Sequence, residues 1–144
     1  MATRSRIGIQ IGNDILSSYH HWDGYPEWLG RILKTHYNTK EKVAELIDGG
    51  DMSSCWTDER WENSNKKGSQ HSNGHKYGPQ YYSDRDGDVT PPVLMSMDEY
   101  LTKDNNEEYA YVFTSAGWTC YHMNEFDDSK QPELVEISDF PLAA

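Results

Sequence analysis

Residues 6–22 read RIGIQIGNDILSSYHHW, two apolar runs separated by a short polar stretch. In the first run Ile7, Ile9 and Ile11 alternate with small or polar residues, which is the period of a strand with one buried face. The Gly-Asn-Asp sequence of residues 12–14 is typical of a tight turn. The pattern predicts a β-hairpin at the start of the chain.

Two histidines, His20 and His21, end the second predicted strand. Successive side chains of a strand point to opposite faces, so this pair cannot ligate one metal ion while the strand stays extended. We therefore expect each to be an ordinary surface or core residue of the strand.

A helix is predicted directly after the hairpin. Pro26 suits the first helical position, and the next residue, Glu27, suits the positive end of the helix. Apolar residues and one histidine then follow at helical spacing. They are Leu29, Ile32, Leu33 and His36.

A second short helix is predicted by the next stretch. Asn38, with Glu41 three residues later, forms the pattern of a capping box, and the helix should end at residues 49–50, which are both glycine. The expected buried stripe is Val43, Leu46 and Ile47. Residues 51–57 fit either a short strand or a turn.

The C-terminal half predicts one helix and a second hairpin. Ser96 and Glu99 form a capping box that opens a short helix with Met97, Tyr100 and Leu101 turned inward. The predicted strands cover residues 109–113 and 118–123, with a turn between them and one more strand at 134–137.

These elements predict an α+β fold in which two antiparallel β-hairpins form a sheet packed by two to three short helices. The 144 residues are enough for one small domain, covering 1–144. Residues 58–80 lack aliphatic side chains and are expected to form a long polar loop, and residues 124–144 an acidic tail.

Composition excludes the membrane and secreted classes. Only 35% of the residues are hydrophobic, mean hydropathy is -0.90, and no apolar run approaches the roughly 18 residues of a membrane span. The first residues show no signal-peptide core. Cys55 and Cys120 are expected to be free buried thiols of a cytoplasmic protein, with a disulfide as the alternative.

The net charge of -11 is unevenly distributed. Residues 1–83 contain ten acidic and ten basic residues, whereas residues 84–144 contain fourteen acidic and three basic ones. Such acidity repels nucleic acid, so direct DNA or RNA binding is excluded, and a partner protein with a basic surface is expected instead. The alternative interpretation is acidity that only keeps the protein soluble.

Acidic residues of the C-terminal half are the predicted partner-binding residues. They are Asp84, Asp86, Asp88, Asp127 and Asp128. The first three have the spacing of a calcium loop, but Val89 stands where that loop needs glycine and Met95 where it needs a bidentate glutamate. We therefore expect no calcium ion there.

Residues 19–26, YHHWDGYP, are the most distinctive stretch. Their aromatic side chains can join the hairpin to the first helix, which is a purely structural role. The same region, with an arginine from elsewhere, would also suit a nucleotide. The predicted ligand-binding residues are His21, Trp22, Asp23, Tyr25 and Arg85.

Catalytic motifs are absent from the sequence: it contains no G-x-S-x-G, no phosphate-binding glycine loop with lysine and no H-E-x-x-H. His71 and His75 have the spacing of zinc ligands on a helix, but residues 72–74, Ser-Asn-Gly, favour a turn. We therefore expect no catalytic residues, no metal and no cofactor. A metal-dependent hydrolase is the least favoured alternative.

Three motifs of the sequence are SRIGI, HWDGYP and LIDGGDMSS. In these motifs, and over roughly residues 5–123, the chain resembles a family of small proteins of unassigned function from tailed phages and prophages. The matching segments are residues 5–9, 21–26, 36–37, 42–43, 46–54, 81–88 and 108–118. It implies a virus-encoded accessory protein in the cytoplasm of a bacterial host, and it implies no particular chemistry.

The expected function is therefore that of a phage protein that binds and inhibits a host protein, such as a defence or nucleic-acid-handling factor, through an acidic surface. A binding protein that sequesters a host nucleotide signal is the alternative.

Overall fold

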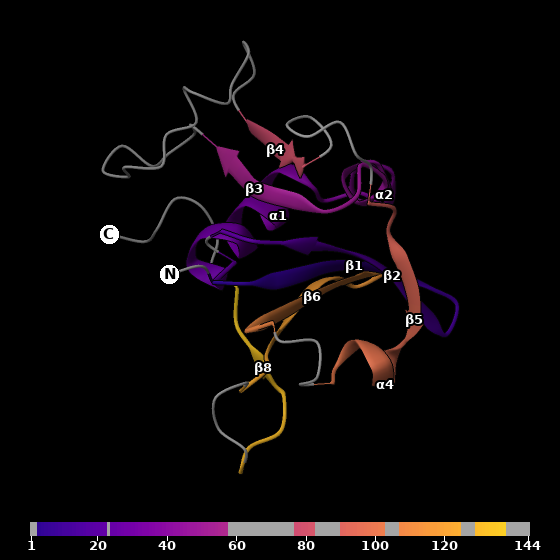
Figure 1. Cartoon of the computed structure of the whole chain (residues 1–144), viewed down its shortest axis with the longest axis vertical. Coiled ribbons are helices and arrows are strands. Elements are labelled where there is room, and N and C mark those ends of the chain that lie inside the picture. The colour runs from indigo at the N-terminus through magenta and orange to yellow at the C-terminus, as the bar shows by residue number, and fades with distance from the viewer. Residues whose placement is uncertain are drawn as a thin grey trace.

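The computed structural model describes residues 3–22, 24–57, 77–82, 90–102, 107–124 and 129–137. These residues form a mixed sheet with helices on both faces, an α+β fold (Figure 1). Seven strands are paired in the order β4-β3-β2-β1-β6-β7-β8, and an eighth strand, β5, pairs with β2.

The two predicted hairpins are confirmed, and they form the middle of the sheet. The first consists of β1 (Ser5–Ile11) and β2 (Asp14–His20), and the second of β6 (Tyr109–Thr114) and β7 (Gly117–His122). They join through β1 and β6, which are parallel. Two segments at opposite ends of the chain therefore share the centre of the fold.

Four further strands extend the sheet beyond the two hairpins. They are β3 (Met52–Thr57), β4 (Tyr77–Tyr81), β5 (Val93–Ser96) and β8 (Glu133–Val135). The sheet is therefore larger than the predicted sheet of two hairpins. The predicted polar loop of residues 58–80 also ends earlier than expected, because β4 begins at Tyr77 and pairs with β3. Residues 58–76 lie outside the described residues.

One edge of β2 is divided between two strands. Its C-terminal end pairs with β3 in parallel, with His20 opposite Met52. Its N-terminal half pairs with β5 in antiparallel fashion, from Asp14 opposite Ser96 to Ser17 opposite Val93. The sheet therefore branches at β2.

The predicted helices after the first hairpin are present, with two differences. The first begins as a π-helical turn, η1 (Pro26–Gly30), before it continues as α1 (Arg31–His36). The second, α2 (Lys40–Asp48), is capped by the hydroxyl of Thr39, which accepts from the Lys42 backbone N–H, and not by Asn38. Threonine and asparagine are both good N-cap residues, and the predicted N-cap position is wrong by one residue.

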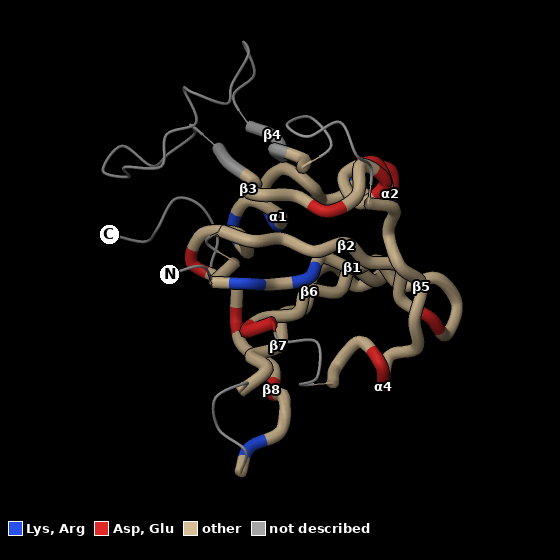
Figure 2. Tube along the Cα trace, viewed as in Figure 1, with Lys and Arg blue, Asp and Glu red and all other residues tan. Residues whose placement is uncertain are grey.

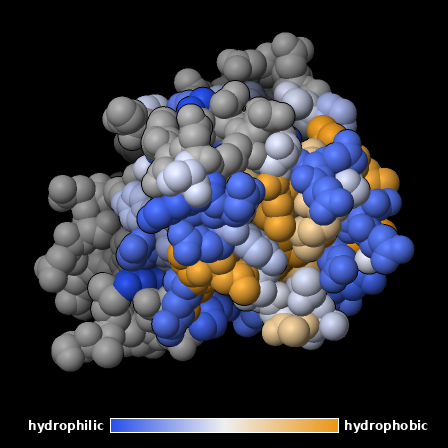
Figure 3. Space-filling model, turned by 90° about the horizontal axis from the view of Figure 1, so that it is seen from below, coloured by the Kyte–Doolittle hydropathy of each residue, from blue (hydrophilic) through white to orange (hydrophobic). Residues whose placement is uncertain are grey.

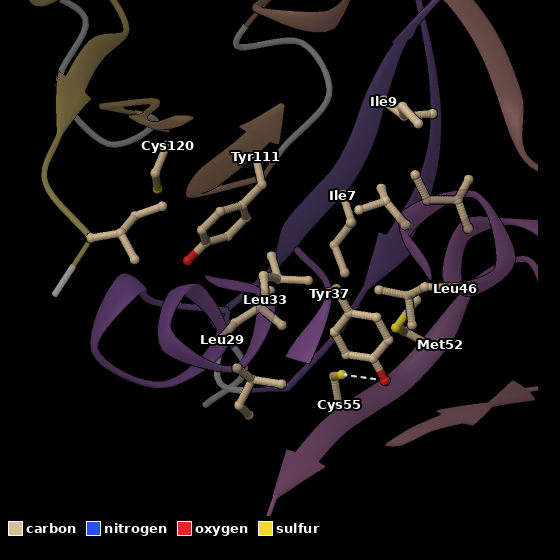
Figure 4. Packing of buried hydrophobic residues seen from close by; sticks show 14 of the residues in the cluster. Ile7, Ile9, Leu29, Leu33, Tyr37, Leu46, Met52, Cys55, Tyr111 and Cys120 are labelled. Carbon is tan, nitrogen blue, oxygen red and sulfur yellow. Dashed lines mark hydrogen bonds between the residues drawn. The ribbon is translucent and has the colours of Figure 1, made fainter. Parts of the chain in front are cut away.

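The helix-side core lies between these helices and one face of the sheet (Figure 4). Ile7 and Ile9 of β1 point into it, and Tyr111 and Cys120 contribute from the second hairpin. Its members from the helices are Trp28, Leu29, Ile32, Leu33, Val43, Leu46 and Ile47. The stripe predicted for α2 is thus confirmed as buried.

The opposite face of the sheet carries a smaller core under α4 (Met97–Tyr100). The predicted capping box of Ser96 and Glu99 is present in both directions. Tyr100 is the helix residue that inserts, and its hydroxyl donates to the Tyr111 carbonyl at 2.6 Å. The remaining buried members of this core are Ile15, Ala110, Val112 and Met123.

Gly8 allows Tyr100 to approach the sheet. A Cβ atom at Gly8 would lie 2.5 Å from Cγ2 of Ile15 and 3.0 Å from the Tyr100 hydroxyl. Because Gly8 is buried, no space remains for either neighbour to move away.

Among the described helices, none has the combined length and apolar character needed to cross a bilayer.

Replacing Gly8→Ala is therefore expected to lower the free energy of unfolding by about 1–3 kcal/mol through overpacking. Urea denaturation measures this change. Gln10→Ala is the matched control, since Gln10 is an exposed residue of the same strand and should change stability by about 0.5 kcal/mol or less. Equal stability of the two variants would contradict the packing described here.

Candidate functional site

His20 is a fully buried residue that joins three strands. Its Nε2 accepts the backbone N–H of Cys55 in β3 at 3.1 Å. A neutral imidazole that accepts at Nε2 carries its proton on Nδ1. Nδ1 lies 3.3 Å from Oγ of Ser5 in β1, so the Nδ1–H donates to that hydroxyl. The imidazole thus connects β1, β2 and β3.

Burial keeps this imidazole neutral. Desolvation, with a smaller contribution from neighbouring His21, lowers the pKa of His20 from 6.5 to about 3. The side chain is therefore a structural hydrogen-bonding group at neutral pH. The expectation that His20 and His21 lie on opposite faces is confirmed, since His20 faces the helix-side core and His21 does not.

Cys55 is surrounded by the same network. Its carbonyl accepts from Nε1 of Trp28 at 3.1 Å, and its thiol donates to the Tyr37 hydroxyl, with 4.0 Å between sulfur and oxygen (Figure 4). Cys55 and Cys120 are both buried and free, as expected. Burial raises the pKa of Cys120 to about 12, so that thiol is a poor nucleophile at neutral pH.

An aromatic cluster formed by Tyr19, His21 and Trp22 lies at the end of β2. The Tyr19 hydroxyl and Nδ1 of His21 are hydrogen-bonded at 2.7 Å, and the rings of His21 and Trp22 meet edge to face with centroids 4.7 Å apart. Trp22 is nevertheless 45% exposed. The hydrogen bond and the ring contact thus fix the cluster, while the indole ring of Trp22 is exposed to solvent.

Charged groups surround Tyr19. Its backbone N–H donates to Oδ1 of Asp51 at 2.9 Å. Burial raises the pKa of Tyr19 to about 12, and the nearby positive charge of Arg4 partly opposes that rise. Arg6, opposite Tyr19 on β1, lies with its Nε 3.4 Å from Oε1 of Glu107. The phenol therefore stays protonated at neutral pH near Arg4.

The predicted ligand-binding residues are only partly brought together. His21 and Trp22 are neighbours in the aromatic cluster. Tyr25 instead packs against the helix-side core, which is the structural role considered above. Asp23 and Arg85 lie outside the described residues.

All five predicted partner-binding aspartates lie outside the described residues, as do His71 and His75. Within the part of the chain that is described, no group of three or more histidine, cysteine, aspartate or glutamate side chains is placed to hold a metal ion. The acidic side chains that are described occupy several elements, including α2, α4 and β8 (Figure 2).

Tyr19, Arg4 and Asp51 are site residues that the sequence analysis missed. Strand alternation was a usable signal for Tyr19, because it places Tyr19 and His21 on one face of β2. The contact between Tyr19 and Asp51 joins residues 32 positions apart. No local pattern marks such a pairing.

No family model, curated protein or solved structure matches this chain. The chemistry of the described residues therefore carries the functional argument.

His20 predicts a specific pH dependence of stability. The unfolded chain binds a proton on this imidazole below about pH 6.5, whereas the folded protein binds it only near pH 3. The contribution of the neutral imidazole to the free energy of unfolding is therefore complete above pH 6.5, and it is lost as the pH falls from 6.5 towards 3. Relative to His20→Gln, the native chain should lose up to about 1.4 kcal/mol of stability per pH unit there.

Urea denaturation of both proteins between pH 7 and pH 4 makes the comparison. The variant removes only this imidazole, so the other titrating groups cancel in the difference between the two curves. Parallel curves would show that His20 is not buried in its neutral form.

Proposed function

We propose that this protein is a non-catalytic binding protein that docks on a basic surface of another protein. The observation that carries the proposal is the aromatic cluster of Tyr19, His21 and Trp22, a preorganised surface with a 45% exposed indole. Tryptophan is enriched among the residues that dominate protein–protein binding energies, and its ring attracts lysine and arginine side chains. Trp22 is the proposed central contact.

The described charges support a basic partner. The exposed acidic residues are Glu27, Glu41, Glu45, Asp48, Asp98, Glu99, Glu133 and Glu136. The exposed basic residues are Lys34, Lys40, Lys42 and Lys130. Two of the described arginines are largely buried: Arg31 is 3% exposed, and the Arg6 side chain is 15% exposed beside Glu107. A surface with this excess of negative charge attracts positively charged partners. Added salt shortens the distance over which the attraction acts.

The resemblance to phage and prophage proteins suggests where the partner would be found. A virus-encoded accessory protein would act in the cytoplasm of a bacterium, so the partner would be a host protein. A defence or nucleic-acid-handling factor with a basic nucleic-acid groove would provide the surface that the proposal requires.

Trp22→Ala is expected to weaken partner binding by about 2 kcal/mol, a roughly thirtyfold loss of affinity, because the central aromatic contact disappears. The measurement is quantitative mass spectrometry of proteins retained from bacterial lysate by the immobilised chain, followed by titration of the purified partner. Leu134→Ala is the matched control, since Leu134 is 65% exposed on β8 and outside the cluster.

Retention of the same protein by the native chain and by Trp22→Ala with equal affinity would contradict the proposal. Raising the salt from about 0.05 M to 0.5 M should also weaken binding by the native chain, since the Debye length falls severalfold over that range. Binding that is independent of salt would rule out charge complementarity as its basis.

A nucleotide binder is the second candidate function. The observation that favours it is the positive charge of Arg4 next to Tyr19, in the same cluster as the exposed Trp22. An indole can stack on a base and a guanidinium can bind phosphate.

Under this alternative, a nucleotide at about one hundred times its Kd should stabilise the protein by about 2.7 kcal/mol. Thermal denaturation with mononucleotides and cyclic dinucleotides measures the effect, and Arg4→Gln should reduce it. Absence of stabilisation by every nucleotide would eliminate this candidate and leave protein binding unaffected.

A further inference from the structure

β5 is an edge strand within the described part of the chain. It pairs with β2 along one side, and no described strand pairs with its other side. An edge strand presents backbone N–H and C=O groups that can pair with another extended chain, and proteins usually blunt such edges with charge or proline. β5 has the sequence VLMS, which contains neither a charged residue nor a proline; the nearest prolines, at positions 91 and 92, precede the strand.

Two apolar side chains of β5 are exposed. Val93 is 47% exposed and Leu94 is 56% exposed. The strand registers place Leu94 opposite Leu16, Leu16 opposite Ile9, and Ile9 opposite Phe113. An apolar row therefore crosses four strands on the helix side of the sheet and reaches solvent at Leu94.

The apolar surface extends beyond β5 itself. Ile11 is 50% exposed on β1, on the same face as Ile9 and Leu94. In a space-filling view from below, apolar patches interrupt the hydrophilic exterior at the centre and on the right, and β5 and α4 lie on the right in Figure 1 (Figure 3). A chain added to β5 would thus gain apolar contacts as well as backbone hydrogen bonds.

The charges next to β5 are negative at both of its ends. Asp14 is paired opposite Ser96, and Asp98 follows two residues after it. At the other end, a Cβ atom at Gly50, two residues after Asp48 ends α2, would contact the carbonyl of Thr90, three residues before β5. Figure 2 shows acidic segments at α2, at the β1–β2 turn and at α4 around β5.

We propose that the free edge of β5 binds an extended segment of a partner protein in which apolar and basic side chains alternate. Backbone pairing with β5 supplies the affinity, Leu94 contacts the apolar side chains, which all lie on the helix side of the sheet, and the flanking carboxylates select lysine or arginine. A second copy of this chain is disfavoured, because it would bring the same acidic flanks together. The basic character of the segment rests on the proposed function.

The test uses the full chain and a short synthetic peptide that alternates valine and lysine. Hydrogen exchange of backbone amides, followed by NMR, should slow about tenfold or more at residues 93–96 when the peptide saturates the protein. Leu94→Lys should weaken peptide binding about tenfold or more, because it adds a positive charge and removes an apolar contact. Leu134→Lys, an equivalent change on β8, should leave peptide binding unchanged.

Three results would overturn the inference. The first is equal binding of a peptide that alternates valine and glutamate. The second is protection of amides in β4 or β8 instead of β5. The third is protection of β5 that grows with protein concentration in the absence of peptide, which would identify a second copy as the occupant. Each of these leaves the effect of Trp22→Ala on partner binding as a separate test of the proposed function.

Discussion

The hydrogen bonds of one buried imidazole hold the branched sheet together. His20, in β2, accepts a hydrogen bond from the backbone N–H of Cys55 in β3 and donates one to the hydroxyl of Ser5 in β1. A single side chain therefore connects three strands that are far apart in the sequence. Both bonds require the neutral imidazole with its proton on Nδ1. Burial supplies that state by lowering the pKa to about 3, because a charged ring would lose its hydration without gaining a counter-ion.

The branch point at β2 relates the two surfaces proposed for binding. The end of β2, where this imidazole lies, pairs with β3, and the first half of β2 pairs with the short strand β5. The next residue, His21, points to the opposite face, where the Tyr19 hydroxyl holds it, and its ring contacts that of the exposed Trp22. The strand β5 and the aromatic cluster thus lie at the two ends of β2.

The sequence predicts the local elements better than their assembly. Both hairpins and the Ser96 capping box were predicted, because alternation, turn residues and capping patterns act within a few residues. The pairing of β1 with β6 and the contact of Tyr19 with Asp51 were not, because both join distant segments and depend on packing. β5 was missed because four uncharged residues after two prolines carry too little pattern to identify a strand.

The ring nitrogens of His20, followed by ¹⁵N NMR as the pH is lowered, provide the most direct test of this account. We predict a neutral Nδ1–H tautomer at pH 7 that persists unchanged at pH 5, well below the ordinary pKa of 6.5. A protonated imidazolium at pH 5 in the folded protein, or a proton on Nε2 at pH 7, would contradict the hydrogen-bonding scheme on which the branch point depends.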